Sequence, residues 1–330
     1  DPMQTDKIAK LNPCIVPLSK IDLDPGPCCM SFGFDLKPLI QSIQQVGLIN
    51  PPLLMEKKEG GFMIISGYKR ILAHQEMGLH EIDSRIMPEG LTRLECLCIN
   101  LYENLTVREL NPVERGMVLS RLQSWVPQDQ ILFQYMPLLG LPSHKQTLAL
   151  YQKIEQDLDD AVKESLAGGR LSMQAVKMLM DQDPASRSAL FGLISGINLN
   201  MNQQTQVIDD IIDISYIERK SIPQVLTNHA LENIISDPHM NNPQKAKTVL
   251  DHLRGRRSPT VQKAERVFKS KVASLDLPKN VQISAPPYFE GPHLKLTIWF
   301  NNGKQLKDKI RQISKLNNLD ALDFPWKVEP

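Results

Sequence analysis

Two segments of this 330-residue chain combine residue types that could bind a phosphate group. The first is Ser66-Gly67-Tyr68-Lys69-Arg70, placed where an apolar run expected to form a strand gives way to a helix-like pattern. Glycine lets a ligand approach the backbone, the N-terminus of a helix attracts anions, and Lys69 and Arg70 add two positive charges. The segment therefore predicts a phosphate site, with an ordinary surface loop as the alternative.

The second segment places Glu103 and Asn104 side by side, with Arg108 a little further along the chain. A carboxylate next to an amide oxygen can hold a hydrated Mg²⁺ between the phosphates of a nucleotide, and an arginine can compensate the phosphate charge. The alternative is structural. In that case Glu103 and Asn104 end one helix, and Asn111-Pro112-Val113-Glu114 begins the next as a capping box with proline at the first helical position.

Residues 13–90 contain the elements that would position both segments. A helix is predicted over 36–46, capped by Asp35 and ended by Gly47, because its apolar residues recur at helical spacing. A further helix is expected over 68–77, and strands are expected over 15–23, 53–55, 62–65 and 82–87. This alternation predicts a small α+β domain.

From about residue 91 to 235 the pattern is helical, and one stretch has the spacing of a helix–turn–helix: residues 130–139, the turn 140–142, and residues 143–154. A recognition helix contacts DNA near its N-terminus, which here would present Ser143, His144, Lys145 and Gln146. Any helical hairpin with a glycine turn has similar spacing, and Pro137 is unfavourable inside the first helix. A hairpin without DNA contacts is therefore the alternative.

The charge of the chain is balanced overall, at +1, but not along its length. Residues 243–318 hold 16 Lys and Arg against 5 Asp and Glu, a net charge of +11, which leaves −10 for the rest. Such asymmetry is typical of a part that faces a polyanion such as DNA. The densest cluster, interpreted as a basic linker or a helix end, consists of Arg254, Arg256 and Arg257. A solvated, lysine-rich surface is the alternative.

The C-terminal end predicts a small α-β-β-α unit, with a helix over 260–275, strands over 281–283 and 294–300, and a helix over 304–316. A unit of this size leaves sheet edges and an apolar face uncovered, so pairing with a second copy of the chain is predicted. Packing of the unit on the rest of the chain is the alternative.

Composition argues against several other classes of protein. The five cysteines have no zinc-ligand spacing and are odd in number, so reduced thiols of a cytoplasmic protein are expected. No apolar run approaches the roughly 20 residues of a membrane helix. No charged-then-apolar signal segment opens the sequence. Neither a membrane anchor nor a secreted disulfide scaffold is expected.

The order of the motifs resembles that of the ParB family of chromosome and plasmid partition proteins. The segments that carry the resemblance are Ile49-Asn50-Pro51-Pro52, Gly67-Tyr68-Lys69-Arg70, Glu103-Asn104 and Leu110-Asn111-Pro112-Val113-Glu114. It covers about residues 14–120 and continues to about 180, where Gly168-Gly169-Arg170-Leu171-Ser172 is similar to a glycine-then-Leu-Ser segment of the family.

The resemblance implies an α+β fold in four parts: a small ParB- and sulfiredoxin-like N-terminal domain (13–110), an all-α domain with the helix–turn–helix (111–240), a basic linker (241–258), and an α-β-β-α C-terminal dimerisation domain (259–330). It implies that CTP is bound by Gly67, Lys69, Arg70, Asn104 and Arg108, with Mg²⁺ on Glu103 and Asn104. It also implies a homodimeric, CTP-dependent clamp on DNA that acts in chromosome or plasmid partition, with CTP hydrolysis slow or absent. A ParA-type ATPase would be its partner, and the nucleoid in the cytoplasm its location.

The sequence departs from the family pattern at the same segments. Tyr68 stands where the family usually has Glu, Leu72 replaces a common Arg, and Arg108 lies one position later than the family's arginine. No basic residue occurs between Ile21 and Leu36, where the family usually has one. Two alternatives stay open: a DNA-binding transcriptional regulator that needs no nucleotide, and a nuclease-type enzyme on the same scaffold, which would need several converging carboxylates or histidines.

Overall fold

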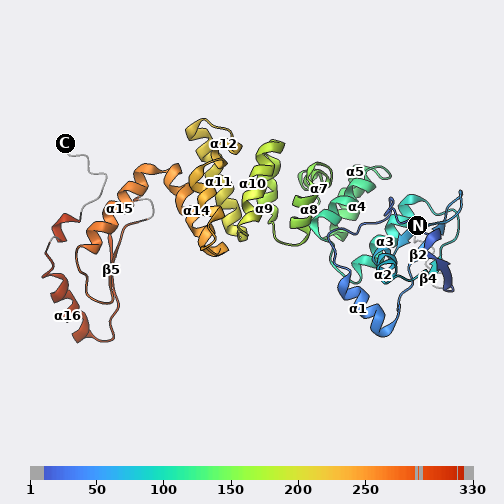
Figure 1. The fold of residues 1–330 in the computed structure, drawn as a ribbon, viewed down its shortest axis with the longest axis horizontal. Coiled ribbons are helices and arrows are strands. Elements are labelled where there is room, and N and C mark those ends of the chain that lie inside the picture. The colour runs from blue at the N-terminus through green and yellow to red at the C-terminus, as the bar shows by residue number, and fades with distance from the viewer. Residues whose placement is uncertain (1–10, 287–288, 290–292, 318, 323–330) are drawn as a thin grey trace. The chain divides into compact units, whose positions relative to one another are not determined.

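The computed structural model describes residues 11–286, 289, 293–317 and 319–322. The chain is mixed α+β and mostly helical, and it divides into two compact units, Asp1–Asp181 and Gln182–Pro330 (Figure 1). The division into four domains at 110, 240 and 258 stays a prediction, and residues 323–330 of the last predicted domain lie outside the described part.

The first unit begins with a four-stranded sheet of order β1-β4-β2-β3. Its strands are β1 (Cys14–Pro17), β2 (Leu53–Glu56), β3 (Phe62–Ser66) and β4 (Glu81–Ile86). β2 and β3, two of the predicted strands, pair antiparallel, and β2 runs parallel to β4. The strand predicted over 15–23 is shorter than expected, because the chain turns at Leu18–Lys20 and then makes only a single bridge from Ile21 to Phe62.

Two helices of the first unit, α2 (Tyr68–Glu76) and α3 (Arg93–Leu105), pack against this sheet, and α1 (Lys37–Val46) packs against α2. Asp35 accepts a hydrogen bond from the N–H of Lys37, at 3.0 Å, and Gly47 ends α1 with φ of +76°. The core beneath α2 is aliphatic and consists of Val16, Ile21, Leu54, Ile64, Ile71 and Ile82. Full burial of each such side chain contributes about 1.5–3 kcal/mol, so the sheet holds the start of α2 firmly in place.

Five further helical segments complete the first unit: α4 (Pro112–Leu122), a segment from Gln128 to Leu138, α7 (Lys145–Asp157), α8 (Asp160–Ala167) and α9 (Met173–Met180). The segment 128–138 comprises α5 (Gln128–Gln130), the wider turn η3 (Ile131–Tyr135) and α6 (Met136–Leu138). The wide turn bonds the N–H of Met136 to the carbonyl of Ile131, five residues back. Pro137 is thereby accommodated, because widening the helix at this point relieves the conflict between a proline ring and the preceding turn.

A glycine sets the contact between α4 and α7. A Cβ atom on Gly116 would lie 2.5 Å from the carbonyl oxygen of Tyr151, so the two helices approach more closely than any side chain at residue 116 allows. Gly140, with φ of +67°, makes the turn before α7 at the predicted place. The helices therefore match the predicted spacing of a helix–turn–helix, whereas its DNA contacts stay a prediction.

The second unit consists of a helical part and a small α/β end. The helices are α10 (Pro184–Gly196), α11 (Met201–Glu218), α12 (Ile222–Leu226), α13 (His229–Ser236), α14 (Asn242–Arg257), α15 (Pro259–Ala273) and α16 (Gly303–Ile313). β5 (Val281–Ser284) and β6 (Lys295–Ile298) form a two-stranded antiparallel sheet. The segment interpreted as a basic linker or a helix end lies in α14 and closes that helix.

Among the described residues, no helix is both long and apolar enough to cross a membrane. All five cysteines are free thiols, and only Cys14 is exposed.

Candidate phosphate-binding cavity

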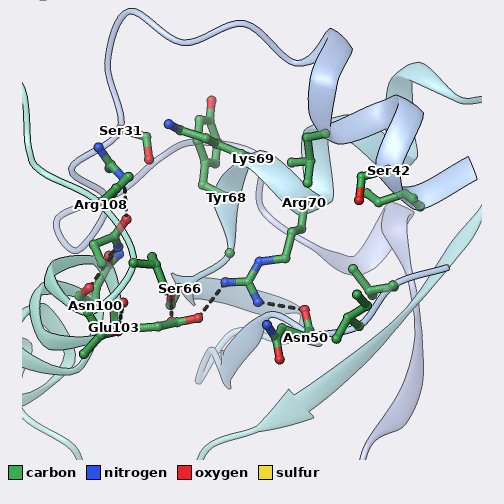
Figure 2. Close-up of a pocket in the computed structure, with 18 of the residues that line it drawn as sticks. Ser31, Ser42, Asn50, Ser66, Tyr68, Lys69, Arg70, Asn100, Glu103 and Arg108 are labelled. Carbon is green, nitrogen blue, oxygen red and sulfur yellow. Dashed lines mark hydrogen bonds and ion pairs between the residues drawn. The ribbon is translucent and has the colours of Figure 1, made fainter. Parts of the chain in front are cut away.

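A cavity of about 550 Å³ opens at the N-terminus of α2 (Figure 2). It lies between the loop after α1, the turn from β3 into α2, and the C-terminal end of α3 with the loop that follows. The residues predicted to bind a nucleotide or a metal all line it, namely Gly67, Lys69, Arg70, Glu103, Asn104 and Arg108. The two segments that the sequence separates by more than thirty residues therefore face one space.

Gly67 is required by the backbone at the base of the cavity. It lies between β3 and α2 with φ of +92°, in the left-handed region that favours glycine. A Cβ atom on Gly67 would lie 2.6 Å from Cβ of Pro52. The turn can therefore pass close to the loop before β2 only with glycine at this position.

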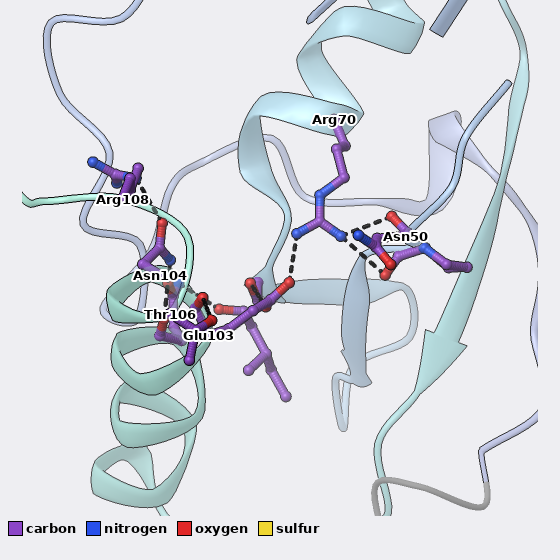
Figure 3. A network of polar contacts seen from close by, with 10 residues as sticks. Asn50, Arg70, Glu103, Asn104, Thr106 and Arg108 are labelled. Atoms are coloured by element: carbon purple, nitrogen blue, oxygen red, sulfur yellow. Dashed lines mark hydrogen bonds and ion pairs between the residues drawn. The ribbon is translucent and has the colours of Figure 1, made fainter. Parts of the chain in front are cut away.

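Arg70 is held in the cavity on two sides (Figure 3). Its Nη1 atom donates to the carbonyl oxygens of Asn50, at 2.7 Å, and Pro51, at 3.2 Å. Its Nη2 atom lies 2.6 Å from Oε1 of Glu103. The other carboxylate oxygen of Glu103 accepts a hydrogen bond from the hydroxyl of Ser66. Both oxygens of Glu103 thus have donors of the protein itself.

Lys69 lies half-buried over an aromatic ring. Its Nζ atom is 4.7 Å from the centre of the Phe34 ring, and Phe34 makes an edge-to-face contact with Tyr68 at 6.2 Å. Burial, and then the positive charge of Arg108, hold the pKa of Lys69 below its ordinary value. The Lys69 ammonium is therefore less well solvated than a surface lysine, which strengthens its attraction for an anion.

Arg108 is fixed by two acceptors. Its Nε atom donates to Oδ1 of Asn104 at 2.9 Å, and its Nη1 atom lies 2.6 Å from Oε2 of Glu114. The Glu114 side chain is 1% exposed and also forms the capping box with Asn111 at the start of α4. Glu114 therefore connects the cavity to α4 in addition to the capping role that the sequence predicts for it.

Asn104 is oriented in turn by Asn100. Its Nδ2 atom donates to Oδ1 of Asn100 at 2.6 Å, and the amide of Asn100 donates to the carbonyl oxygens of Ile65, at 2.6 Å, and Cys28, at 2.9 Å. These hydrogen bonds of the side-chain amides connect the end of α3 to β3 and to the loop before α1. The sequence spacing identifies Asn104, and Ser66 opens the first predicted motif, whereas Asn100 and Phe34 are contributions of the fold, which no motif in the sequence indicated.

The loop before α1 is held by its backbone. Besides the Cys28 carbonyl, the carbonyl of Cys29 accepts a hydrogen bond from Arg121 of α4. The N–H of Phe32 donates to Oε1 of Glu114 at 3.2 Å, and its carbonyl accepts from Nδ2 of Asn111 at 3.0 Å. This loop is the part of the chain where the expected basic residues are missing.

The donors of this cavity do not fit a divalent metal in the arrangement observed. Mg²⁺ binds carboxylate and carbonyl oxygens and is repelled by a cation held next to them. The oxygens of Glu103 accept from Arg70 and Ser66, and the amide oxygen of Asn104 accepts from Arg108. Within the part of the chain that the structure describes, no group of three His, Cys, Asp or Glu residues could hold a metal ion.

The predicted DNA-contacting residues lie in both units. Ser143, His144, Lys145 and Gln146 lie at the N-terminal end of α7, where the last three are exposed. The cluster in the second unit is different. Arg256 pairs with Glu218 at 2.8 Å, and Arg257 pairs with Asp210 at 2.8 Å and with Asp213 at 2.5 Å. Two of the three arginines are thus neutralised by α11 carboxylates.

Comparison with known proteins identifies relatives for the part of the chain that forms the cavity. Residues 16–105 match the family model of the ParB N-terminal domain. A probable chromosome-partitioning protein ParB from Campylobacter jejuni is 27% identical over 193 residues, which are 57% of this chain and 66% of that protein. One from Pseudomonas putida is 30% identical over 148 residues, 45% of this chain and 49% of that protein. The chain thus spans 66% of the length of the first relative and 49% of the second.

Two solved structures of Caulobacter crescentus ParB, both C-terminally truncated, are also similar. One is complexed with CTP-γ-S and is 23% identical, with a TM-score of 0.26, covering 52% of this chain and 93% of that chain. The other is complexed with the centromeric parS site and is 20% identical, with a TM-score of 0.33, covering 58% and 96%. Both TM-scores are low, and neither superposition carries the ligand over to this chain.

Proposed function

Because residues 16–105 of this chain match the ParB N-terminal domain, we propose that the protein binds DNA in the manner of a chromosome- or plasmid-partitioning protein and binds CTP in the cavity at the start of α2. We further propose that it acts as a homodimeric, nucleotide-dependent clamp. A ParA-type ATPase as partner and the nucleoid as location follow from the same family relationship.

One observation carries the nucleotide part of this proposal: Lys69, Arg70 and Arg108 line a single cavity whose base is the glycine turn into a helix. Backbone at a helix N-terminus and clustered cations favour phosphate, and about 550 Å³ lies within the usual range of roughly 300–1,000 Å³ for small-molecule sites. The choice of cytosine as the base rests on the family resemblance alone.

Each residue of the cavity would make a different contribution to phosphate binding. Gly67 lets a phosphate approach the first turn of α2, and Arg70, held from behind by two carbonyls, presents its guanidinium in a fixed orientation. Lys69 and Arg108 line the same cavity; Lys69 adds a positive charge, and the charge of Arg108 is partly balanced by Glu114. No step is assigned to a metal, because the oxygens of Glu103 and Asn104 already have cationic or hydroxyl partners.

The decisive test is a calorimetric titration of CTP, with ATP as the comparison, into the full-length protein and into Lys69→Ala/Arg70→Ala. We expect CTP-selective binding that the double variant loses. Lys58→Ala/Arg93→Ala removes the same two charges from exposed positions outside the cavity and should bind like the wild type. Absence of nucleotide binding to the wild-type protein contradicts the proposal.

The DNA part of the proposal rests on α7, which presents Lys145 and Gln146 at its exposed N-terminal end. Dimerisation is proposed for the C-terminal sheet, because Leu296, Trp299 and Phe300 are exposed on or next to β6. An apolar cluster of this kind is covered when a second copy pairs with it. Sedimentation of the wild type and of Trp299→Lys tests this, and an unchanged monomer in both contradicts it.

A second candidate function is a DNA-binding regulator that uses no nucleotide. The specific observation in its favour is that Arg70 already has a carboxylate partner, Glu103, while Tyr68 replaces the family's usual Glu. The same CTP titration separates the two functions. A nuclease-type enzyme is not supported within the described residues, where no cluster of acidic, His or Cys side chains gathers for a metal.

A further inference from the structure

We propose that Glu103 is an internal anion, which in the ligand-free protein occupies the position on Arg70 that a ligand's phosphate takes on binding. Glu103 is then a competitor for the ligand and not a metal ligand, and a phosphate chain binds without a divalent cation. The inference deepens the proposed nucleotide function and rests on it.

The geometry of Arg70 makes such an exchange possible. Its Nη1 atom is anchored to the carbonyls of Asn50 and Pro51, so the guanidinium keeps its place when its other partner changes. Only Nη2 is engaged by Glu103, at 2.6 Å. The side chains of Arg70 and Glu103 are 20% and 34% exposed, so this pair lies at the solvent-accessible wall of the cavity and not in the core.

Carboxylate and phosphate oxygens are equivalent acceptors for a guanidinium, so a phosphate can replace Glu103 without loss of a charge-assisted hydrogen bond. Both negative groups cannot remain next to one another at low cost, because like charges in a partly buried site repel. Ligand binding therefore has to displace Glu103 from Arg70 and Ser66. The free energy needed to break these two contacts reduces the free energy of ligand binding.

The same contacts oppose a divalent cation at Glu103. A cation on Oε1 would lie beside the Arg70 guanidinium, and one on Oε2 would displace the Ser66 hydroxyl. Asn104, the second predicted metal ligand, has its oxygen on Nε of Arg108. Two arginines thus take the places that a metal would need, and they provide the positive charge themselves.

The test is a calorimetric titration of tripolyphosphate and of CTP into the full-length protein in EDTA and, in parallel, in Mg²⁺. The key variant is Glu103→Gln, which removes the internal negative charge. Loss of one partly exposed ion pair is worth about 1 kcal/mol, so we expect Glu103→Gln to bind tripolyphosphate about fivefold more tightly in EDTA. Glu109→Gln, the same change at an exposed position, should bind within about twofold of the wild type and so corrects for long-range charge.

A second variant, Ser66→Ala, keeps all charges and removes only the hydroxyl that holds Glu103, so it should tighten binding in the same direction by a smaller factor. Melting temperatures check that every variant is folded. Weaker binding by Glu103→Gln, or wild-type binding that disappears in EDTA and returns with Mg²⁺, overturns the inference and leaves the nucleotide function standing. Absence of binding of either probe to any form in either buffer overturns both.

Discussion

Gly67 shows how a single residue can limit the shape of the cavity. Its φ of +92° and its distance from Pro52 are independent obstacles to any side chain. We predict that Gly67→Ala destabilises the protein by about 3 kcal/mol, more than the roughly 1–2 kcal/mol of a left-handed alanine alone. Urea unfolding measures this. Gly78→Ala is the matched control, because Gly78 has φ of +72° and nothing within 4 Å of an added Cβ. Equal losses for both variants would contradict a role of the Pro52 contact.

Lys69 gives a prediction for pH. Its pKa is lowered by burial and by Arg108, so on raising the pH it loses its proton before an exposed lysine does. Deprotonation removes a positive charge from the cavity, and phosphate binding should therefore weaken as the pH rises from about 7 to about 10. Tripolyphosphate titrations across this range test the effect. Lys69→Arg, which stays charged throughout, should show a flatter profile. Profiles that coincide would show that Lys69 does not contribute its charge to binding.

The same lowered pKa of Lys69 affects the stability of the fold in the opposite direction from its effect on phosphate binding. The unfolded chain binds the Lys69 proton more tightly than the folded chain, so this residue makes the folded state more stable as the pH rises through the interval between the two pKa values. Binding and stability should thus change in opposite directions over the same pH range.

At the residue scale the sequence predicted which side chains converge but not how they are held. Gly67, Lys69 and Arg70 belong to one short motif, Asn104 and Arg108 belong to a second, and all five line one cavity. The Arg70–Glu103 and Arg108–Glu114 pairs depend on how α2, α3 and α4 are packed in space. Side chains that pair across elements leave no periodic pattern in the sequence.

Among the elements, the contact of α4 with α7 is the most sensitive to substitution. We predict that Gly116→Ala destabilises the protein by about 2–3 kcal/mol, since the new Cβ would overlap the Tyr151 carbonyl at 2.5 Å. Gly192→Ala, in the middle of α10 with nothing within 4 Å, should instead stabilise by up to about 1 kcal/mol through helix propensity. Thermal unfolding followed by circular dichroism distinguishes the two. A stabilised Gly116→Ala variant would show that the two helices can separate freely.

The ends of the helices show where element prediction succeeded and where it did not. The capping box at Asn111 was identified from its sequence, and the structure confirms it. The same type of box begins α14, where Asn241 and Gln244 exchange hydrogen bonds of 2.9 and 3.0 Å. A basic linker was predicted over 241–258 from the arginines, and this helix start was not predicted from the sequence. Clustered charge indicates an exposed surface but not a backbone conformation, whereas a capping box indicates where a helix begins.

On the scale of the whole molecule, the two basic regions are expected to act differently. We predict that Lys145→Ala weakens binding to duplex DNA and reduces the slope of log affinity against log salt by about 1, because it removes one phosphate contact. Fluorescence anisotropy over a range of salt concentrations measures both quantities. Arg257→Ala is the contrast, since Arg257 pairs with Asp210, whose side chain is only 4% exposed.

Removing Arg257 leaves the buried Asp210 carboxylate with a neutral donor, Nε2 of Gln206 at 3.0 Å, but without a cation, which costs about 2 kcal/mol of stability. The DNA affinity and the salt slope of the Arg257→Ala variant should equal those of the wild type. A reduced salt slope for Arg257→Ala would show that this arginine contacts DNA. An unchanged slope for Lys145→Ala would contradict the proposal that α7 contacts DNA.

The loop before α1 has one further consequence. It is fastened to α3 and α4 through the carbonyls of Cys28, Cys29 and Phe32 and the N–H of Phe32. Every residue type supplies such a carbonyl, and every type except proline supplies the N–H. Amino-acid replacements at its solvent-facing positions can therefore accumulate while the loop keeps its path, whereas Cys28, Cys29 and Met30 are buried and constrained by packing. Two proteins that share these anchors would superimpose at the backbone of this loop although few of its exposed residues are identical. A sequence alignment would then show a difference at a place where the backbone path is the same.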